Sequence, residues 1–251
     1  MTTGEPCWIH LFTSDVDAAI TFYGDLFGWS AGDPSEEFGG YRMFLRGDEP
    51  LAGLMPNDTP NPSVWEVFLQ TPDIEATVAR ARDRGAVIAT EVMAVADLGS
   101  MTSIIDPAGA LVGAWQPEGF PGFVTRAEAG TPGWFETLSS SYADSVAFYQ
   151  DAFGWSTHVV SDTPEFRYTT LGQDEHARAG IMDGSAFLDG EPSRWHVYLA
   201  VDDTDDTVAR AVAAGGEVVL QAEDTPYGRI AELTDPAGVR FRVMGPNAEA
   251  S

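Results

Sequence analysis

The sequence has no lysine, a single cysteine and no long apolar run. Because Cys7 is alone, an internal disulfide and a thiolate zinc cluster are excluded, and the low use of cysteine favours a reducing, cytoplasmic location. No apolar stretch reaches the roughly 18 residues that a membrane-spanning helix needs. The residues before Cys7 include no basic side chain, so we do not predict a secretory signal.

Basic residues are scarce relative to acidic ones. Asp and Glu total 39 against 13 arginines, which gives a formal net charge of -26. A surface this negative repels phosphate backbones and anionic lipid headgroups, so nucleic acids and membranes are not expected partners. A neutral or cationic small molecule is the expected partner, although the acidic residues also serve solubility.

The most informative feature that is present is a duplication. The segment PCWIH from Pro6 is repeated as PGWFE from Pro132, and FY and FGW motifs follow both copies at the same separation of 126 residues. A repeat of this length indicates a duplicated domain and not a solenoid unit. We therefore predict domains at 1–118 and 130–247, joined by a Pro- and Gly-rich linker at 119–129.

Each half contains the same order of elements twice, namely a strand, a helix and three strands. Apolar residues at helical spacing predict helices over 15–27 and 73–84. In the DPAG segment at Asp106, proline presets the second position of a turn and glycine suits the fourth. The chain is therefore predicted to be an α+β protein of four βαβββ modules. The predicted strands of the first half are 8–13, a short run near Trp29, 41–45, 51–55, 64–70, 87–90, 101–105 and 110–115.

These motifs resemble the vicinal oxygen chelate superfamily, which includes glyoxalase I, bleomycin-resistance proteins, fosfomycin-resistance enzymes and extradiol dioxygenases. The resemblance rests on the FY and FGW segments, the WEVFL strand at Trp65, the WHVYL strand at Trp195 and the two DPAG turns. It covers nearly the whole chain and looks like the tandem glyoxalase-like proteins of actinobacteria, some of which occur with antibiotic pathways. It implies two tandem glyoxalase-like domains with two cupped sheets, in a monomer or a homodimer.

The resemblance also implies a position for a divalent metal, which would act as a Lewis acid on two neighbouring oxygens of a substrate. In the superfamily the ligands come from the first and last strands of the modules. The first-strand positions of this chain are His10, Glu66, Glu136 and His196. All four are residue types that bind metals.

The last-strand positions depart from the superfamily pattern. Where the family has a glutamate after the DPAG turn, this chain has Gly113 in the first half and Arg242 in the second. Neither residue binds a metal, and the nearest acid in the other last strands is Asp183. The sequence therefore predicts no certain cofactor and, at most, a weakly bound divalent metal.

Module pairing decides which of these residues share a cup, and the sequence leaves it open. Pairing in sequence order would place His10 with Glu66, and Glu136 with His196. A swapped pairing would place the two histidines together beside Arg242, and the two glutamates together.

Residues two positions from a ligand-type position share its face of the strand, and here they are mostly aromatic. The predicted ligand-binding residues are Trp8, Phe12, Phe68, Trp115, Trp134, Leu138 and Tyr198. For the remaining paired tryptophans, strand alternation points the side chains toward the helices, so they are predicted to lie in the core. These are Trp29, Trp65, Trp155 and Trp195.

The residues of the cups and the resemblance lead us to expect one of two functions. The first is a binding protein of the bleomycin-resistance type that holds an apolar or aromatic, natural-product-like molecule in its cups. The alternative is a glyoxalase-type lyase or isomerase, or a natural-product tailoring enzyme, with or without a metal. In that enzyme His10 or His196 would be a general base or metal ligand, Glu66 or Glu136 its partner, and Arg242 an oxyanion stabiliser. An extradiol dioxygenase is disfavoured, because its third ligand would have to lie at position 113 or 242.

Overall fold

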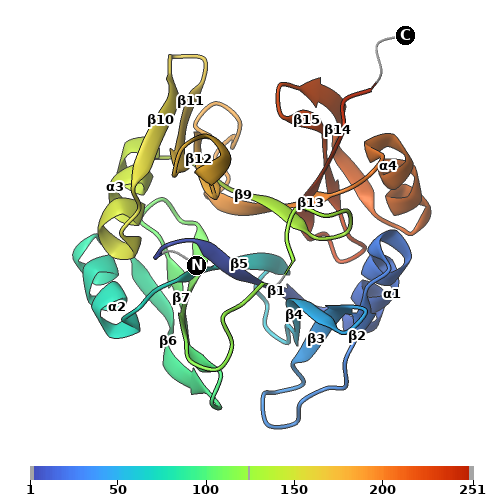
Figure 1. Cartoon of the computed structure of the whole chain (residues 1–251), viewed down its shortest axis with the longest axis horizontal. Coiled ribbons are helices and arrows are strands. Elements are labelled where there is room, and N and C mark those ends of the chain that lie inside the picture. The colour runs from blue at the N-terminus through green and yellow to red at the C-terminus, as the bar shows by residue number, and fades with distance from the viewer. Residues whose placement is uncertain (1–2, 124, 249–251) are drawn as a thin grey trace. The chain divides into compact units, whose positions relative to one another are not determined.

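A computed structural model describes residues 3–123 and 125–248, and its elements follow the predicted order (Figure 1). The first half comprises β1 (Pro6–Thr13), α1 (Val16–Phe27), β2 (Ser30–Ala31), β3 (Arg42–Arg46), β4 (Glu49–Pro56), β5 (Val64–Gln70), α2 (Ile74–Asp83), β6 (Val87–Val95), β7 (Gly99–Ile105) and β8 (Leu111–Pro117). The second half comprises β9 (Pro132–Ser139), α3 (Tyr142–Phe153), β10 (Thr157–Asp162), β11 (Arg167–Leu171), the 3-10 turn η1 (Asp174–His176), β12 (Ala179–Asp183), β13 (Arg194–Ala200), α4 (Thr204–Ala213), β14 (Glu217–Thr225), β15 (Gly228–Thr234) and β16 (Arg240–Gly245).

The described strands form two mixed eight-stranded sheets, which confirms the α+β prediction. Their orders are β2-β3-β4-β1-β5-β8-β7-β6 and β10-β11-β12-β9-β13-β16-β15-β14. Each sheet holds two modules that are consecutive in sequence, so the strands pair in sequence order.

The contacts of the chain, by contrast, cluster into two compact units that each draw on both halves. Unit 1 comprises the chain up to Trp8, Glu66–Gly122 and Phe135–Trp195, and within it α2 packs against α3 (Figure 1). Unit 2 comprises Ile9–Trp65, Phe123–Trp134 and the chain from His196 onward, and within it α1 packs against α4. The helices therefore follow the swapped pairing although the strands do not.

The helix ends lie where the sequence places them. Asp15 precedes α1 and its side chain accepts a hydrogen bond from the Ala18 amide at 2.9 Å. Gly28 ends that helix in the left-handed region, at φ 71°, which glycine adopts without steric cost. Asp73 and Asp203 cap α2 and α4 in the same way as Asp15.

Aromatic clusters form the core beneath the helices. Trp29, Trp65, Trp155 and Trp195 are each at most 4% exposed, which confirms their predicted burial. Tyr23 is stacked on Trp29 with ring centres 5.4 Å apart, and Tyr149 lies 5.0 Å from Trp155 in the other unit. Burial of such large rings supplies much of the apolar stabilisation of each unit.

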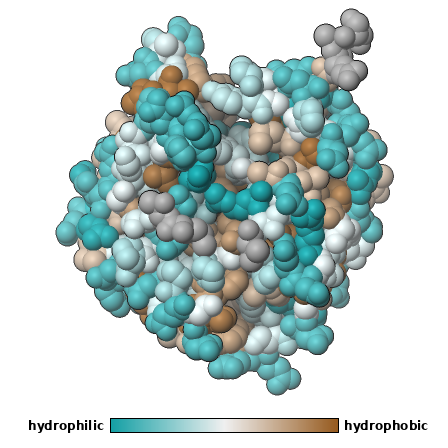
Figure 2. All heavy atoms as spheres, in the orientation of Figure 1, coloured by the Kyte–Doolittle hydropathy of each residue, from teal (hydrophilic) through white to brown (hydrophobic). Residues whose placement is uncertain are grey.

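The surface agrees with the composition. Hydrophilic side chains dominate the face drawn in Figure 2, and apolar residues appear there in small groups. No helix within residues 3–123 and 125–248 is long and apolar enough to span a bilayer.

Candidate functional site

A buried charged cluster lies in unit 2, where β13, β15 and β16 run side by side. Both Nε and an Nη of Arg242 donate to Oε2 of Glu232, at 3.0 and 2.9 Å. Arg240 donates to the other carboxylate oxygen at 3.3 Å. His196 Nε2 lies 3.8 Å from that same oxygen. Glu232 is only 2% exposed, so these contacts compensate a charge that burial alone would penalise heavily.

Tyr198 completes the cluster from β13. Its hydroxyl accepts a hydrogen bond from Arg242, and the guanidinium carbon of Arg242 lies 5.2 Å from the centre of the tyrosine ring. The register β13–β16 pairs these two residues directly. The structure thus brings together three of the residues that the sequence singled out, His196, Tyr198 and Arg242.

Glu232 is the member of this cluster that our sequence analysis missed. The superfamily pattern directs attention to the last strand of a module, whereas Glu232 lies on β15, the strand before it, directly opposite Arg242. The alternation of β15 and its pairing across a short turn were readable in the sequence and would have signalled an acid facing an arginine. The equivalent residue of the first half is Ser103, which faces Gly113.

A cavity of about 240 Å³ opens beside the cluster. Glu232 and Arg242 form part of its lining, and the rest consists of three apolar and three polar side chains from β14 and β15. The lining residues are Leu220, Gln221, Glu223, Thr225, Ile230, Ala231, Glu232 and Arg242.

His10, which also belongs to unit 2, lies against aromatic residues. Its Nε2 is 3.4 Å from the Tyr41 hydroxyl, and its ring meets Phe12 edge-on with centres 5.9 Å apart. Burial lowers the pKa of His10 to about 3, so its imidazole is neutral over the physiological pH range. On the paired strand β4, a Cβ at Gly53 would lie 2.4 Å from the His10 ring and 2.5 Å from the Tyr41 hydroxyl.

In unit 1, Glu66 is fully buried on β5. No hydrogen bond of ordinary geometry reaches either carboxylate oxygen from the described residues. Burial raises the pKa of Glu66 to about 8, and the nearby Ser103 hydroxyl opposes part of this rise. The ring of Phe68 covers Gly113 so closely that a Cβ there would lie 2.2 Å from Cδ1 of Phe68.

The other first-strand acid, Glu136, is 5% exposed and pairs with Gly180 on β12. The Tyr168 hydroxyl lies 2.1 Å from where a Cβ of Gly180 would be. Asp183, at the end of the same strand, accepts a hydrogen bond from the Ser185 amide and lies 3.6 Å from Arg167. It is therefore engaged at the strand end.

These residues do not fit the metal site that the resemblance implies. Two of the four last strands pair a glycine with a first-strand position, and a third places Gly113 beside Phe68; in all three a neighbouring ring occupies the space of the glycine side chain. The fourth strand supplies Arg242, which does not bind metals. Among the described residues no three His, Cys, Asp or Glu side chains are grouped so that they could hold an ion.

The remaining predicted ligand-binding residues are distributed over both units. In unit 1, Trp8 and Trp115 pack on Phe120, with ring centres 4.9 and 6.4 Å away, and Trp115 donates to the Phe120 carbonyl at 2.8 Å. Phe120 belongs to the predicted linker, so linker atoms cover both tryptophans. Leu138 is 4% exposed in unit 1, whereas Phe12 and Trp134 in unit 2 are half-buried.

Comparison with known proteins places the chain in a family. Residues 7–113 match the glyoxalase/bleomycin resistance protein/dioxygenase superfamily, and residues 139–244 match a glyoxalase-like domain. CFP32 of Mycobacterium tuberculosis, whose name provisionally calls it a glyoxylase, is 35% identical over 97% of this chain and 95% of its own length. The chain belongs to the glyoxalase/bleomycin resistance protein/dioxygenase superfamily.

Two further proteins are similar to this chain over most of its length. The anthracycline biosynthesis protein DnrV of Streptomyces peucetius is 31% identical, over 96% of this chain and 93% of its own. The crystal structure of the Mn(II)-bound glyoxalase from Novosphingobium aromaticivorans superposes with a TM-score of 0.67 at 20% identity, over 99% of this chain and 84% of that one. At that identity the similarity shows a shared fold alone.

Proposed function

We propose that this protein binds a small, largely apolar or aromatic molecule in its sheet cups without a catalytic metal, as bleomycin-resistance proteins of the superfamily do. The observation that carries the proposal is the replacement of last-strand ligands by glycines whose side-chain space is filled by His10 and Tyr41, Phe68 or Tyr168. A strand that gives this space to a ring has no room for a carboxylate ligand.

The remaining cup residues support a binding role. Aromatic and apolar side chains with a few polar groups are the usual lining of small-molecule pockets. The name of DnrV, a relative of similar length, is consistent with a natural-product-like ligand. We also propose domains at 1–118 and 130–247, since each contains one family match.

An enzyme of the same superfamily is the second candidate, and the cluster around Glu232 favours it specifically. His196 beside a buried carboxylate resembles a general base with its orienting acid. Arg242 could face an oxyanion only with its charge already balanced by Glu232, which weakens the stabilisation it would give. A metal-free lyase or isomerase is the form of enzyme that these residues support.

Metal content and ligand binding distinguish the two candidates. After dialysis, elemental analysis should find less than one zinc, nickel, manganese or iron atom per chain. In a thermal-shift screen, aromatic natural products should raise the unfolding temperature, whereas divalent metals should not. A stoichiometric metal that disappears in both His10→Ala and His196→Ala would overturn the proposal and favour the enzyme.

A further inference from the structure

We propose that the cavity between β14, β15 and β16 in unit 2 is a binding site for one neutral, flat aromatic molecule of about two fused rings, and that Glu232 sets its charge preference. This inference rests on the proposed binding function and assigns it a place and a ligand class.

The size and lining of the cavity point to a compact aromatic molecule. An apolar cavity of about 150 Å³ accommodates benzene, so the cavity of about 240 Å³ has room for a second ring. Leu220, Ile230 and Ala231 supply apolar walls, and Thr225 and Gln221 offer neutral hydrogen-bonding groups at the side.

The charges at the cavity cancel. Arg242 and Glu232 both line it, and they are joined by two hydrogen bonds while only 13% and 2% of their side-chain surfaces are exposed. At the rim, Glu223 is exposed, so solvent screens its charge, and Arg240 adds a further hydrogen bond to Glu232. An ion entering the cavity would gain no net attraction and would lose its hydration, so a neutral molecule is preferred.

Arg242 also provides a flat surface in the cavity. Tyr198 lies against its guanidinium on one side, and the salt bridge with Glu232 fixes the plane of the group. A planar guanidinium held in this way stacks well on aromatic rings. The same residue therefore favours a flat ligand over a bulky aliphatic one.

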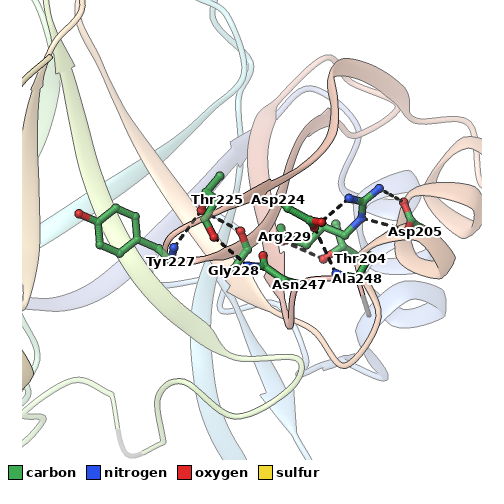
Figure 3. Close-up of polar contacts among 9 residues, drawn as sticks. All are labelled: Thr204, Asp205, Asp224, Thr225, Tyr227, Gly228, Arg229, Asn247 and Ala248. Carbon is green, nitrogen blue, oxygen red and sulfur yellow. Dashed lines mark hydrogen bonds and ion pairs between the residues drawn. The ribbon is translucent and has the colours of Figure 1, made fainter. Parts of the chain in front are cut away.

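The rim of the cavity is fixed before any ligand binds. Figure 3 shows Arg229, at the start of β15, reaching Asp205 in the first turn of α4 and Asp224 at the end of β14. The side-chain Nδ2 of Asn247 donates to the backbone carbonyl of Thr225, a lining residue, at 2.9 Å. These contacts hold the β14–β15 turn in place, so little ordering is required on binding.

The first half lacks this combination at the equivalent place. Ser103 stands where Glu232 is, Gly113 stands where Arg242 is, and the ring of Phe68 fills the space above the glycine. The duplicated strands have therefore diverged, and within residues 3–123 and 125–248 this combination of residues lies in the second half alone.

Two probes that share the naphthalene ring and differ in charge test the assignment on the full-length protein. Calorimetric titration at pH 7 should show one 2-naphthol bound per chain and binding of naphthalene-2-sulfonate at least about tenfold weaker, as expected for a site without net positive charge. Ile230→Trp should fill the cavity and weaken 2-naphthol binding by about tenfold or more. The matched variant Met101→Trp, at the equivalent position of β7, should leave it within about twofold.

Glu232→Gln tests the charge preference. Removal of the compensating charge should improve binding of the sulfonate relative to 2-naphthol by about tenfold, whereas Glu223→Gln at the exposed rim should change the ratio by less, because its charge is screened. Thermal melts establish that each variant is folded, and Ile230→Trp keeps the test independent of the salt bridge.

The possible failures have separate meanings. Failure of the wild type to bind 2-naphthol, or equal binding by Ile230→Trp, would overturn this site. An unchanged probe ratio in folded Glu232→Gln would overturn the role of Glu232. The proposed binding function would survive both results if other aromatic molecules still stabilised the protein, and it would fall only if none did.

Discussion

Two buried glutamates show how strongly the local environment decides the state of one residue type. Glu232 is surrounded by two arginines and a histidine and accepts hydrogen bonds from both arginines. Glu66 has no such compensation, and burial raises its pKa to about 8. At neutral pH the side chain of Glu66 is therefore mainly protonated.

The raised pKa of Glu66 predicts a pH-dependent stability. Because the folded protein holds this proton more tightly than the unfolded chain, stability is fully present below the unfolded pKa of 4.5 and is lost as the pH rises through about 8. We expect Glu66→Gln, which is neutral at every pH, to be more stable than the wild type at pH 9 by a few kcal/mol. At pH 4.5 the two should be nearly equal.

Urea unfolding at both pH values measures this difference. Glu75→Gln on the exposed face of α2 is the matched control and should show no such pH dependence relative to the wild type. If Glu66→Gln were no more stable than the wild type at pH 9, the Glu66 carboxyl would ionise in the folded protein with little loss of stability.

At the scale of elements, the DPAG turn does more than reverse the chain. Its predicted turn hydrogen bond is present, from the Gly109 amide to the Asp106 carbonyl at 2.9 Å. The Asp106 side chain also accepts a hydrogen bond from the Tyr149 hydroxyl at 3.0 Å, and that hydroxyl accepts one from the Trp195 indole at 2.9 Å. The turn of one module is thus bonded to the helix and first strand of others. Tyr23, Trp65 and Asp235 repeat the arrangement in unit 2.

Removal of the Tyr149 hydroxyl should test this network. Tyr149→Phe leaves the indole N–H and one carboxylate oxygen without their partner in a buried place, so we expect a loss of about 2–4 kcal/mol in the free energy of unfolding. Tyr23→Phe should cost less, because the Tyr23–Asp235 hydrogen bond is longer, at 3.3 Å. Urea unfolding measures both losses of stability. The control is Tyr227→Phe, because the side chain of Tyr227 is 65% exposed. Equal stabilities of Tyr149→Phe and the control would contradict the role of the network.

At the scale of the whole molecule, the two halves of the sequence are joined by reciprocal contacts. The Trp155 indole of the second half donates to the Gly4 carbonyl of the first at 2.9 Å. The Trp29 indole of the first half donates to the Gly130 carbonyl of the second at 2.7 Å. Each half therefore supplies both the donor and the acceptor, as in an isologous interface between two subunits.

Arginines at the helix ends repeat this reciprocity. Arg80 of α2 donates to the Ala152 carbonyl in the last turn of α3 at 3.1 Å, and Arg210 of α4 donates to the Leu26 carbonyl in the last turn of α1 at 2.9 Å. A cation at a helix C-terminus is also favoured by the helix dipole. The linker is consequently not what holds the halves together.

A cut in the linker should leave the protein assembled. A protease site inserted after Ala127, which is exposed, allows the folded chain to be cleaved into its two halves. We expect both fragments to elute together at the position of the uncut protein in size-exclusion chromatography and to separate only in denaturant. Each compact unit contains segments of both halves, so non-covalent contacts and not the covalent link hold the fragments together. Separation of the fragments under native conditions would contradict this expectation.

The sequence by itself determined the duplication, the order of elements and the ends of the helices. Caps such as Asp15 and Gly28, turns such as DPAG and the alternation of strands act over a few residues, so their physics is written locally. Sequence reasoning also identified His196, Tyr198 and Arg242, because strand alternation and the superfamily pattern both point to them.

Only the tertiary structure decided how the modules combine and what surrounds each site residue. Strands pair in sequence order while helices pair across the halves. Local sequence patterns do not distinguish these two arrangements, because both bury the same apolar faces. The neighbour of Arg242 proved to be Glu232 on an adjacent strand, and the space at Gly113 proved to be filled by Phe68. Such facts depend on register and on side-chain volume across strands, and these are fixed only when the sheet has formed.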